Sequence, residues 1–217
     1  MTLTKFLYFA VLTLIACSSD PKGVGFTTHT QQALTKGTSR STAMDSFVKS
    51  QSNKQLTRNN HYYKLTKKSG STFQLTWGND CVSRIYNKAI DFFVADRLNI
   101  RWDNKDFMIL DYSTGSGEWK TIVLPLNKHQ TVQEFDNAFC FDTTNNLLGI
   151  IQAGDTLLRV VNLQTQQKQF ILEKDKSCDI PNNFYCIDTI SITNKVLYYK
   201  WKVPGKKNVD KSIRLTI

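Results

Sequence analysis

The strongest constraint on the fold is the pattern of short apolar runs that fills the chain from Thr72 onward. These runs are rich in Val, Ile, Phe, Tyr and Trp, and turn residues separate them at short intervals. No stretch keeps the spacing of an amphipathic helix for three turns, so long helices are not expected in this part of the chain. The pattern predicts an all-β fold of antiparallel strands for residues 72–217.

Three segments of this region resemble one another, which indicates an internal repeat. Each begins with an extended run closed by an aspartate, continues with a second apolar run and ends in a third. The closing residues Asp103, Asp142 and Asp188 are 39 and 46 residues apart. The predicted strands are 98–103, 107–110 and 119–126, then 138–142, 147–151 and 157–163, then 184–188, 196–199 and 211–217. A weaker fourth unit has predicted strands at 73–77, 82–86 and 90–94.

A repeat of about 40 residues filled with three or four short strands resembles the blade of a β-propeller. The chain carries neither a WD dipeptide nor a kelch glycine pair, so no propeller subfamily is indicated. Four such units are few for a closed propeller. The expected fold is therefore propeller-like or a stack of antiparallel sheet repeats, and a two-sheet β-sandwich is the alternative.

Residues 17–71 differ from the region that follows. They are rich in Ser, Thr, Gln, Asn and Lys, and their apolar residues keep no period of a strand or a helix. Such a segment cannot bury enough apolar surface to fold alone. It is expected to be a flexible tether with one helical turn at 42–50, placed between residues 1–16 and a β-rich domain at 72–217.

The first sixteen residues have the features of an export signal. Lys5 precedes residues 6–16, an eleven-residue run that is apolar except for one Thr. This length fits the apolar core of a signal peptide. A membrane-spanning helix needs about 20 apolar residues, so the run is too short to span a bilayer.

The signal ends in Leu14-Ile15-Ala16-Cys17, which resembles the lipobox of bacterial lipoproteins. The resemblance covers residues 1–17 and implies cleavage before Cys17, with acyl chains attached to its sulfur and usually to its new amino terminus. Two or more chains anchor a protein stably, where one binds reversibly. Because Ser18 follows the cysteine, the resemblance implies the cell envelope, and within it the outer membrane facing the periplasm or the cell surface. The alternative is a cleaved signal peptide without lipid.

The net charge of +10 is unevenly spread along the chain. Residues 1–76 contain ten Lys or Arg against two acids, whereas residues 77–217 contain eighteen against sixteen. The basic segment is expected to lie against anionic head groups or acidic envelope polymers, or to be a solvated linker. The near-neutral folded part predicts no basic face, and together with export this argues against nucleic acid as a partner.

The remaining cysteines suit an oxidising compartment because their number is even. Of the three connectivities, Cys178 with Cys186 and Cys81 with Cys140 is preferred, since the first pair flanks a short turn-rich stretch. The two loops would add about 2.5 and 4 kcal/mol of stability. A zinc site is not expected because the chain has no Cys-x-x-Cys pair and its three histidines are scattered. Neither metal nor cofactor is predicted.

Candidate binding residues are few. Trp119 follows Gly117 and Glu118 at a turn, which favours its exposure, and aromatic faces are good platforms for sugar rings. Asp103 and Asp106 flank another turn and could offer oxygen ligands, although their spacing matches no twelve-residue calcium loop. No catalytic residue is indicated, because residues 112–119 lack the spacing of a nucleophile elbow.

These observations predict a membrane-anchored envelope lipoprotein whose β domain binds a partner protein or an envelope glycan without catalysis. An inhibitor or immunity role against an envelope toxin belongs to the same class. The alternative is an anchored hydrolase of polysaccharide or peptide, which would need two opposed acids in a cleft.

Overall fold

The computed structural model describes residues 40–50, 54–115, 117–152, 156–172, 183–203 and 205–217. These described residues belong to one compact unit. The expected signal peptide, residues 1–16, lies outside the described residues, and so do Cys17 and Cys178.

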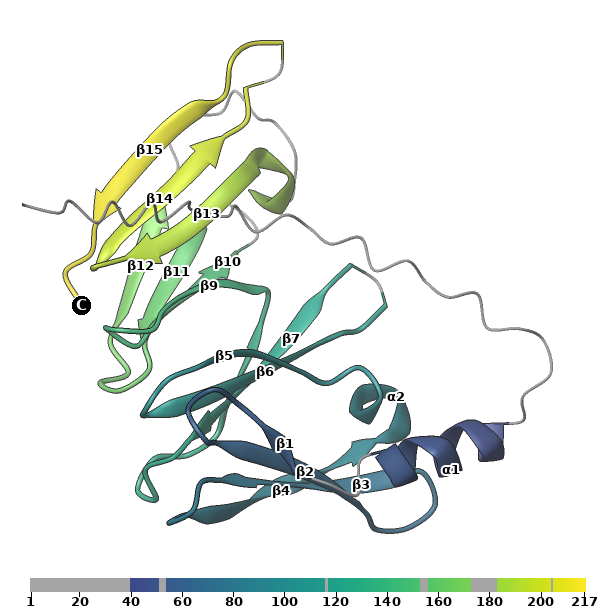
Figure 1. Ribbon diagram of the computed structural model, residues 1–217. Helices are drawn as coiled ribbons and strands as arrows, with labels where there is room; N and C mark the ends of the chain where they lie inside the picture. The colour runs from purple at the N-terminus through teal and green to yellow at the C-terminus, as the bar shows by residue number, and fades with distance from the viewer. Residues whose placement is uncertain (1–39, 51–53, 116, 153–155, 173–182, 204) are drawn as a thin grey trace, which may run out of the picture. The chain divides into compact units, whose positions relative to one another are not determined.

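The described strands form four antiparallel sheets that follow one another along the chain (Figure 1). The first sheet contains β1 (Gln55–Leu56), β2 (Tyr62–Lys67), β3 (Thr72–Gly78) and β4 (Ser83–Asp91). The second contains β5 (Asn99–Asp103), β6 (Phe107–Ser113), β7 (Trp119–Pro125) and β8 (Gln133–Asp136). The third contains β9 (Ala138–Asp142), β10 (Leu147–Ile151), β11 (Thr156–Asn162) and β12 (Lys168–Leu172), and the fourth contains β13 (Ile187–Thr193), β14 (Val196–Trp201) and β15 (Val209–Arg214). Every strand pairs with the next one in its sheet, which confirms the predicted all-β fold of stacked antiparallel sheet repeats.

A hydrophobic core lies between each sheet and the next. Strands β2, β3 and β4 of the first sheet share one buried cluster with β6 and β7 of the second. A further cluster joins β6 and β7 to β9, β10 and β11 of the third sheet, and another joins the third sheet to the fourth. None of the described clusters joins the first sheet to the fourth.

The middle sheets are buried on both faces, and β6 shows this most clearly. Its residues Phe107 to Leu110 are all 0% exposed. Because side chains alternate along a strand, Met108 and Leu110 enter the core with the first sheet, while Phe107 and Ile109 enter the core with the third. A strand that is buried on both faces therefore reads as a continuous apolar run.

The fourth sheet is buried on one face only. In β14, Leu197, Tyr199 and Trp201 are buried, whereas Tyr198 between them is 47% exposed. Its outer face consists largely of hydroxyl-bearing and charged residues from three strands, among them Thr189, Ser191, Lys200, Asp210 and Arg214. A polar outer face lets a stack of repeats end without another sheet to cover it.

Two helices pack against the core between the first and second sheets. Helix α1 (Arg40–Ser50) places Phe47 edge-on against Phe73 and Phe92, with ring centroids 5.3 and 5.4 Å apart. Helix α2 (Phe92–Ala95) begins at Asp91, whose carboxylate accepts a hydrogen bond from the backbone N–H of Val94 and so caps the helix. The helical turn expected at 42–50 is confirmed as α1.

The described structure starts earlier than the predicted domain boundary between residues 71 and 72. Strand β2 lies within the expected tether, yet it pairs with β3 along its whole length. Tyr63 and Leu65 are buried in the first core. The sequence concealed this strand because Lys64 and the polar residues on both sides break its apolar pattern.

Two of the strands predicted for the repeat units also differ from the structure. The expected strand at 90–94 is wrong beyond Asp91, because β4 ends at that residue and α2 follows it. The pairing of β4 with β3 shifts register between Ile85 and Ala89. The expected strand at 184–188 begins instead as the 3₁₀ turn η1 (Asn183–Cys186), and Asp188 lies inside β13 rather than at its end. Asp103 and Asp142 do close their strands, each directly before a hairpin turn.

Candidate functional site

The three predicted binding residues lie at opposite ends of the second sheet. Trp119 opens β7 and pairs with Ser113, whereas Asp103 closes β5 and pairs with Met108 at the other end of β6. Trp119 lies in the strand pair next to the β6–β7 turn and is 36% exposed. The structure therefore does not bring Trp119 together with Asp103 and Asp106 in one site.

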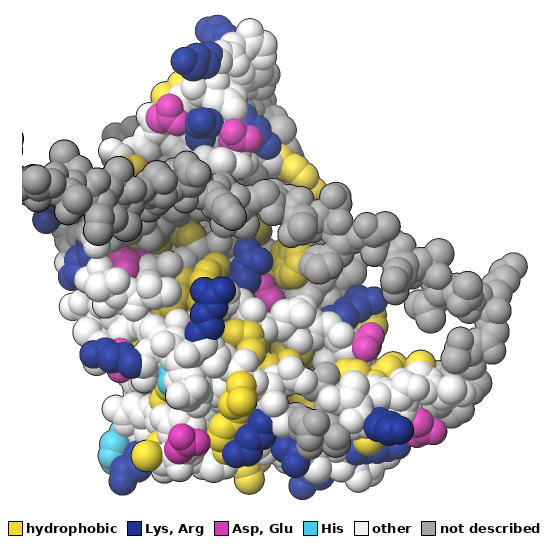
Figure 2. Space-filling model, in the orientation of Figure 1, with side chains coloured by type: hydrophobic (Ala, Val, Ile, Leu, Met, Phe, Trp, Pro, Cys, Tyr) yellow, Lys and Arg dark blue, Asp and Glu magenta, His cyan; other side chains and the backbone are white. Residues whose placement is uncertain are grey.

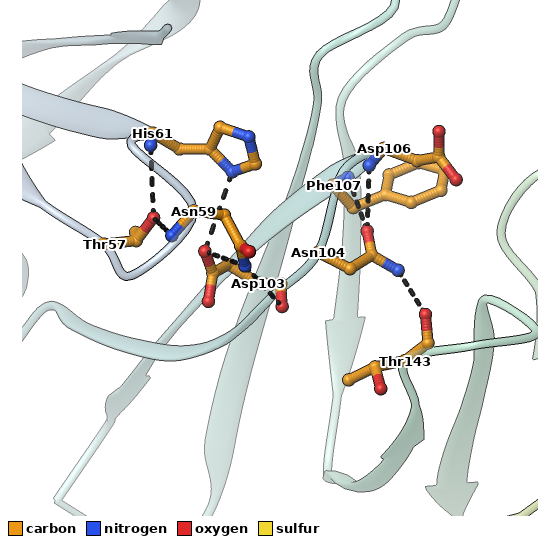
Figure 3. A network of polar contacts seen from close by, with 8 residues as sticks. All are labelled: Thr57, Asn59, His61, Asp103, Asn104, Asp106, Phe107 and Thr143. Atoms are coloured by element: carbon orange, nitrogen blue, oxygen red, sulfur yellow. Dashed lines mark hydrogen bonds and ion pairs between the residues drawn. The ribbon is translucent and has the colours of Figure 1, made fainter.

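Asp103 joins the second sheet to the first (Figure 3). Its carboxylate Oδ2 accepts a hydrogen bond of 2.7 Å from Asn59 Nδ2 and lies 3.7 Å from His61 Nδ1. The turn that carries these partners is shaped by Thr57, whose Oγ1 accepts hydrogen bonds from the backbone N–H groups of Asn59 and His61. The turn between β1 and β2 thus positions Asn59 and His61 beside Asp103.

His61 is the buried titratable group of this junction. Its side chain is 5% exposed, and Nδ1 has no hydrogen-bond partner among the described residues. Burial lowers the pKa of His61 below its ordinary value of 6.5, and the nearby Asp103 carboxylate opposes this shift. The imidazole is therefore neutral at neutral pH, so the contact with Asp103 is not an ion pair there.

Asp106 and Asn104 join the second sheet to the third. Asn104 Oδ1 accepts hydrogen bonds from the backbone N–H groups of Asp106 and Phe107, while its Nδ2 donates to the carbonyl of Thr143 over 2.6 Å (Figure 3). Asn146 Nδ2 donates to Asp106 Oδ2 over 3.0 Å. The two hairpin turns hold each other through amide and carboxylate groups, which satisfies their polar atoms.

Asp142 joins the third sheet to the fourth. The residue is 4% exposed, and Oδ2 accepts a hydrogen bond of 3.1 Å from the backbone N–H of Lys195 in the β13–β14 turn. Burial alone would raise the pKa of Asp142, but hydrogen bonds from Lys195, Asn145 and Thr144 outweigh it and lower the pKa. Three successive junctions therefore use the same device, a strand-closing or turn carboxylate that accepts from the neighbouring sheet.

A second junction between the first and second sheets lies at their outer strands. Arg84 of β4 donates to three backbone carbonyls in and after β7, those of Pro125, Asn127 and Gln130. Tyr86 and Lys88 donate to the same oxygen of Glu134 in β8, over 2.5 and 2.6 Å. Burial would raise the pKa of Glu134, yet these two hydrogen bonds lower it overall.

Asp111 is the described carboxyl group whose pKa is raised. It is 8% exposed in β6, and burial raises its pKa while Arg101, at 3.7 Å, opposes the shift. A shifted carboxyl is the feature expected of a general acid. The described contacts of Asp111 include no second carboxylate, so the pair of facing acids that glycoside hydrolysis needs is not formed around it.

The predicted disulfide between Cys81 and Cys140 is wrong, because both cysteines are free. Cys81 is exposed in the β3–β4 turn of the first sheet, whereas Cys140 is buried in β9 and faces the core with the fourth sheet. Burial raises the pKa of the Cys140 thiol to about 12. Cys186 is buried and is not one of the free cysteines, but Cys178 lies outside the described residues, so their pairing stays a prediction.

Strand β12, which the sequence did not predict, forms an exposed edge of the third sheet. Phe170 and Leu172 are 57% and 60% exposed, and their positions in the strand place them on one face. Phe170 pairs with Arg159 of β11, whose Nε is buried and has no hydrogen-bond partner among the described residues. The strand was missed because its apolar run is only three residues long and follows the polar residues Lys168 and Gln169.

Among the described residues, no three His, Cys, Asp or Glu side chains form a group able to hold a metal ion. No helix in the described part of the chain has the length and apolar character needed to cross a bilayer. The chain matches no protein-family model, and no curated protein is significantly similar to it in sequence.

Proposed function

We propose that the protein is a lipid-anchored, non-catalytic binding protein of the cell envelope, and that its β domain binds a segment of a partner protein along β12. The observation that supports it is the edge of this strand, where two large apolar side chains stand in solvent. Soluble proteins normally protect such edges with charges, bulges or covering segments.

Three of the other outer strands carry more charged residues than β12. Strand β4 contains Arg84 and Lys88, β8 contains Glu134 and Asp136, and β15 contains Asp210, Lys211 and Arg214. In β12 the only charged residue is Lys168 at its start. An extended segment added beside β12 would gain main-chain hydrogen bonds, and Phe170 and Leu172 would contact its alternate side chains.

Arg159 indicates that the partner segment should also supply a hydrogen-bond acceptor. A buried guanidinium nitrogen without a partner is costly, and an acceptor supplied by a bound segment would satisfy it. We therefore expect the partner segment to combine apolar side chains with a carboxylate or carbonyl placed near Phe170. An inhibitor or immunity role is a special case, in which the partner is itself an enzyme or toxin.

The lipid anchor would compensate for a low affinity of β12 for its partner. A domain held to the membrane by acyl chains on Cys17 would meet neighbouring envelope proteins at high effective concentration, so that modest intrinsic affinity is sufficient.

The test places a photo-crosslinking amino acid at Phe170 in the native envelope, with the same substitution at Ile85 as the matched control. Ile85 is 66% exposed on β4 and belongs to another sheet. We expect one protein to be captured from position 170 and not from position 85. The double variant Phe170→Ser and Leu172→Ser should lose that partner with little change in stability, because both side chains are exposed. Equal capture at both positions, or capture of glycan alone, would contradict the proposal.

A further inference from the structure

The net charge of residues 77–217 is close to neutral, but the segment that contains the fourth sheet is strongly basic. Residues 187–217 contain seven Lys or Arg and two acids, whereas residues 77–186 contain eleven Lys or Arg and fourteen acids. The average charge of residues 77–217 therefore hides an uneven distribution between the fourth sheet and the rest. The excess is densest between residues 200 and 211, which hold five lysines and one aspartate.

These lysines belong to the hairpin formed by β14, β15 and the loop between them. We call the described residues 200–203 and 205–211 the basic hairpin. Figure 2 shows dark blue side chains at the upper end of the picture, where Figure 1 draws this loop. Lys206 and Lys207 are exposed, and a backbone hydrogen bond from Lys206 N to Val203 O closes the turn that presents them.

Most of this charge is not neutralised within the described structure. Lys200 pairs with Asp210 over 3.6 Å, and Lys211 lies over the ring of Trp201. Lys202, Lys206 and Lys207 form no ion pair with a described residue. Several like charges held close together repel one another, so an anionic partner would relieve a cost that the folded chain already carries.

The chemistry of the hairpin fits a phosphate-bearing lipid surface. All five cations are lysines, which act as flexible point charges and do not require the fixed two-pronged geometry of an arginine in a protein pocket. Val209 is 42% exposed beside them. The ammonium groups of lysines can contact lipid head groups while their aliphatic chains and neighbouring apolar side chains contact the acyl chains beneath.

From this arrangement we infer that the basic hairpin is a second membrane contact, which docks the β domain on the surface of a bilayer rich in anionic phospholipid. The inference goes beyond the proposed function and does not depend on the acyl chains of Cys17. Docking of this kind would hold the domain at the bilayer and limit the envelope partners that β12 can reach.

The test measures binding of the full chain carrying Cys17→Ser to vesicles of phosphatidylglycerol and phosphatidylcholine, and to vesicles of phosphatidylcholine alone. The hairpin variant changes Lys202, Lys206 and Lys207 to Gln. The matched control changes Lys64, Lys67 and Lys68 to Gln, since these side chains have the same burial classes and lie on another hairpin. Both variants lose the same net charge, and both keep the apolar residues near the N-terminus.

We expect the hairpin variant to lose at least about tenfold in affinity for the anionic vesicles and the control to lose much less, because each surface lysine adds roughly a fivefold gain. The difference should shrink at high salt. Equal losses in both variants would overturn the inference, since net charge alone would then explain binding. Binding to soluble polyphosphate or DNA with the same hairpin dependence, and no binding to vesicles, would overturn it in favour of a soluble polyanion. Thermal unfolding of both variants checks that each remains folded.

Discussion

Gly149 and Cys140 offer a direct test of the core between the third and fourth sheets. The two residues face each other across β10 and β9. A Cβ atom at position 149 would lie 2.4 Å from Cys140 Sγ and 3.2 Å from Ile192 Cδ1, closer than atoms can approach without displacement. The thiol thus occupies the space that the glycine leaves open.

Two single substitutions should therefore destabilise the protein for opposite reasons. Gly149→Ala adds volume to a filled site and should cost about 1–3 kcal/mol of unfolding free energy. Cys140→Ala removes a buried sulfur and should cost about 1 kcal/mol through the cavity it leaves. In the double variant the new methyl group enters that cavity, so the total cost should fall at least about 1 kcal/mol below the sum of the two single costs.

Urea unfolding followed by circular dichroism gives the three free energies. Gly149→Ala combined with Cys81→Ala is the matched control, because Cys81 is exposed in another sheet and its effect should simply add. Additive costs for Gly149→Ala and Cys140→Ala, or no cost for Gly149→Ala alone, would refute this packing.

Three further predictions concern the thiols and two buried titratable groups. In the folded protein a thiol reagent should modify Cys81 quickly and Cys140 only after unfolding, whereas protection of both thiols would restore the disulfide rejected above. Asp142→Asn should cost about 2 kcal/mol at neutral pH, because its amide would face the N–H of Lys195. Because the pKa of Asp142 in the folded protein lies below 3.8, the stability that this carboxylate adds is present above pH 3.8 and is lost as the pH falls through the folded pKa. Chemical unfolding across this pH range should therefore show a smaller loss of unfolding free energy in the variant than in the parent protein. The folded pKa of His61 lies below 6.5, so the unfolded chain binds the extra proton and stability should fall as the pH drops below 6.5, an effect that His61→Gln should remove.

The sequence predicted best the strands whose residues are almost all buried. The predicted strands at 138–142 and 147–151 match β9 and β10 at both ends. A short unbroken apolar run between turns indicates a buried strand where no helical spacing of apolar residues is present. Strands β8 and β12 were missed because each opens with two polar residues and holds too few apolar residues to form a recognisable run. Their pairing depends on the neighbouring strand, which a local pattern does not describe.

The candidate site was predicted only in part. Asp103 was singled out for its place at the end of a strand, and the structure keeps it there. Its partners Asn59 and His61 come from another sheet, 44 and 42 residues earlier in the chain, so no local spacing could identify them. Asparagines in turns were the available signal, because their side chains commonly bond to nearby backbone and tolerate positive φ. The even number of cysteines was a weaker guide to disulfide pairing, since it determines neither the distance between two cysteines nor the direction of their side chains.

Attachment of the chain to a membrane through Cys17 is the premise on which the proposed binding role depends most. Mass spectrometry of the protein extracted from its native envelope measures this directly in the N-terminal peptide. We predict a polypeptide that begins at Cys17 and carries fatty acyl groups on that residue. A mature chain that begins at another residue and carries no fatty acid would contradict the account.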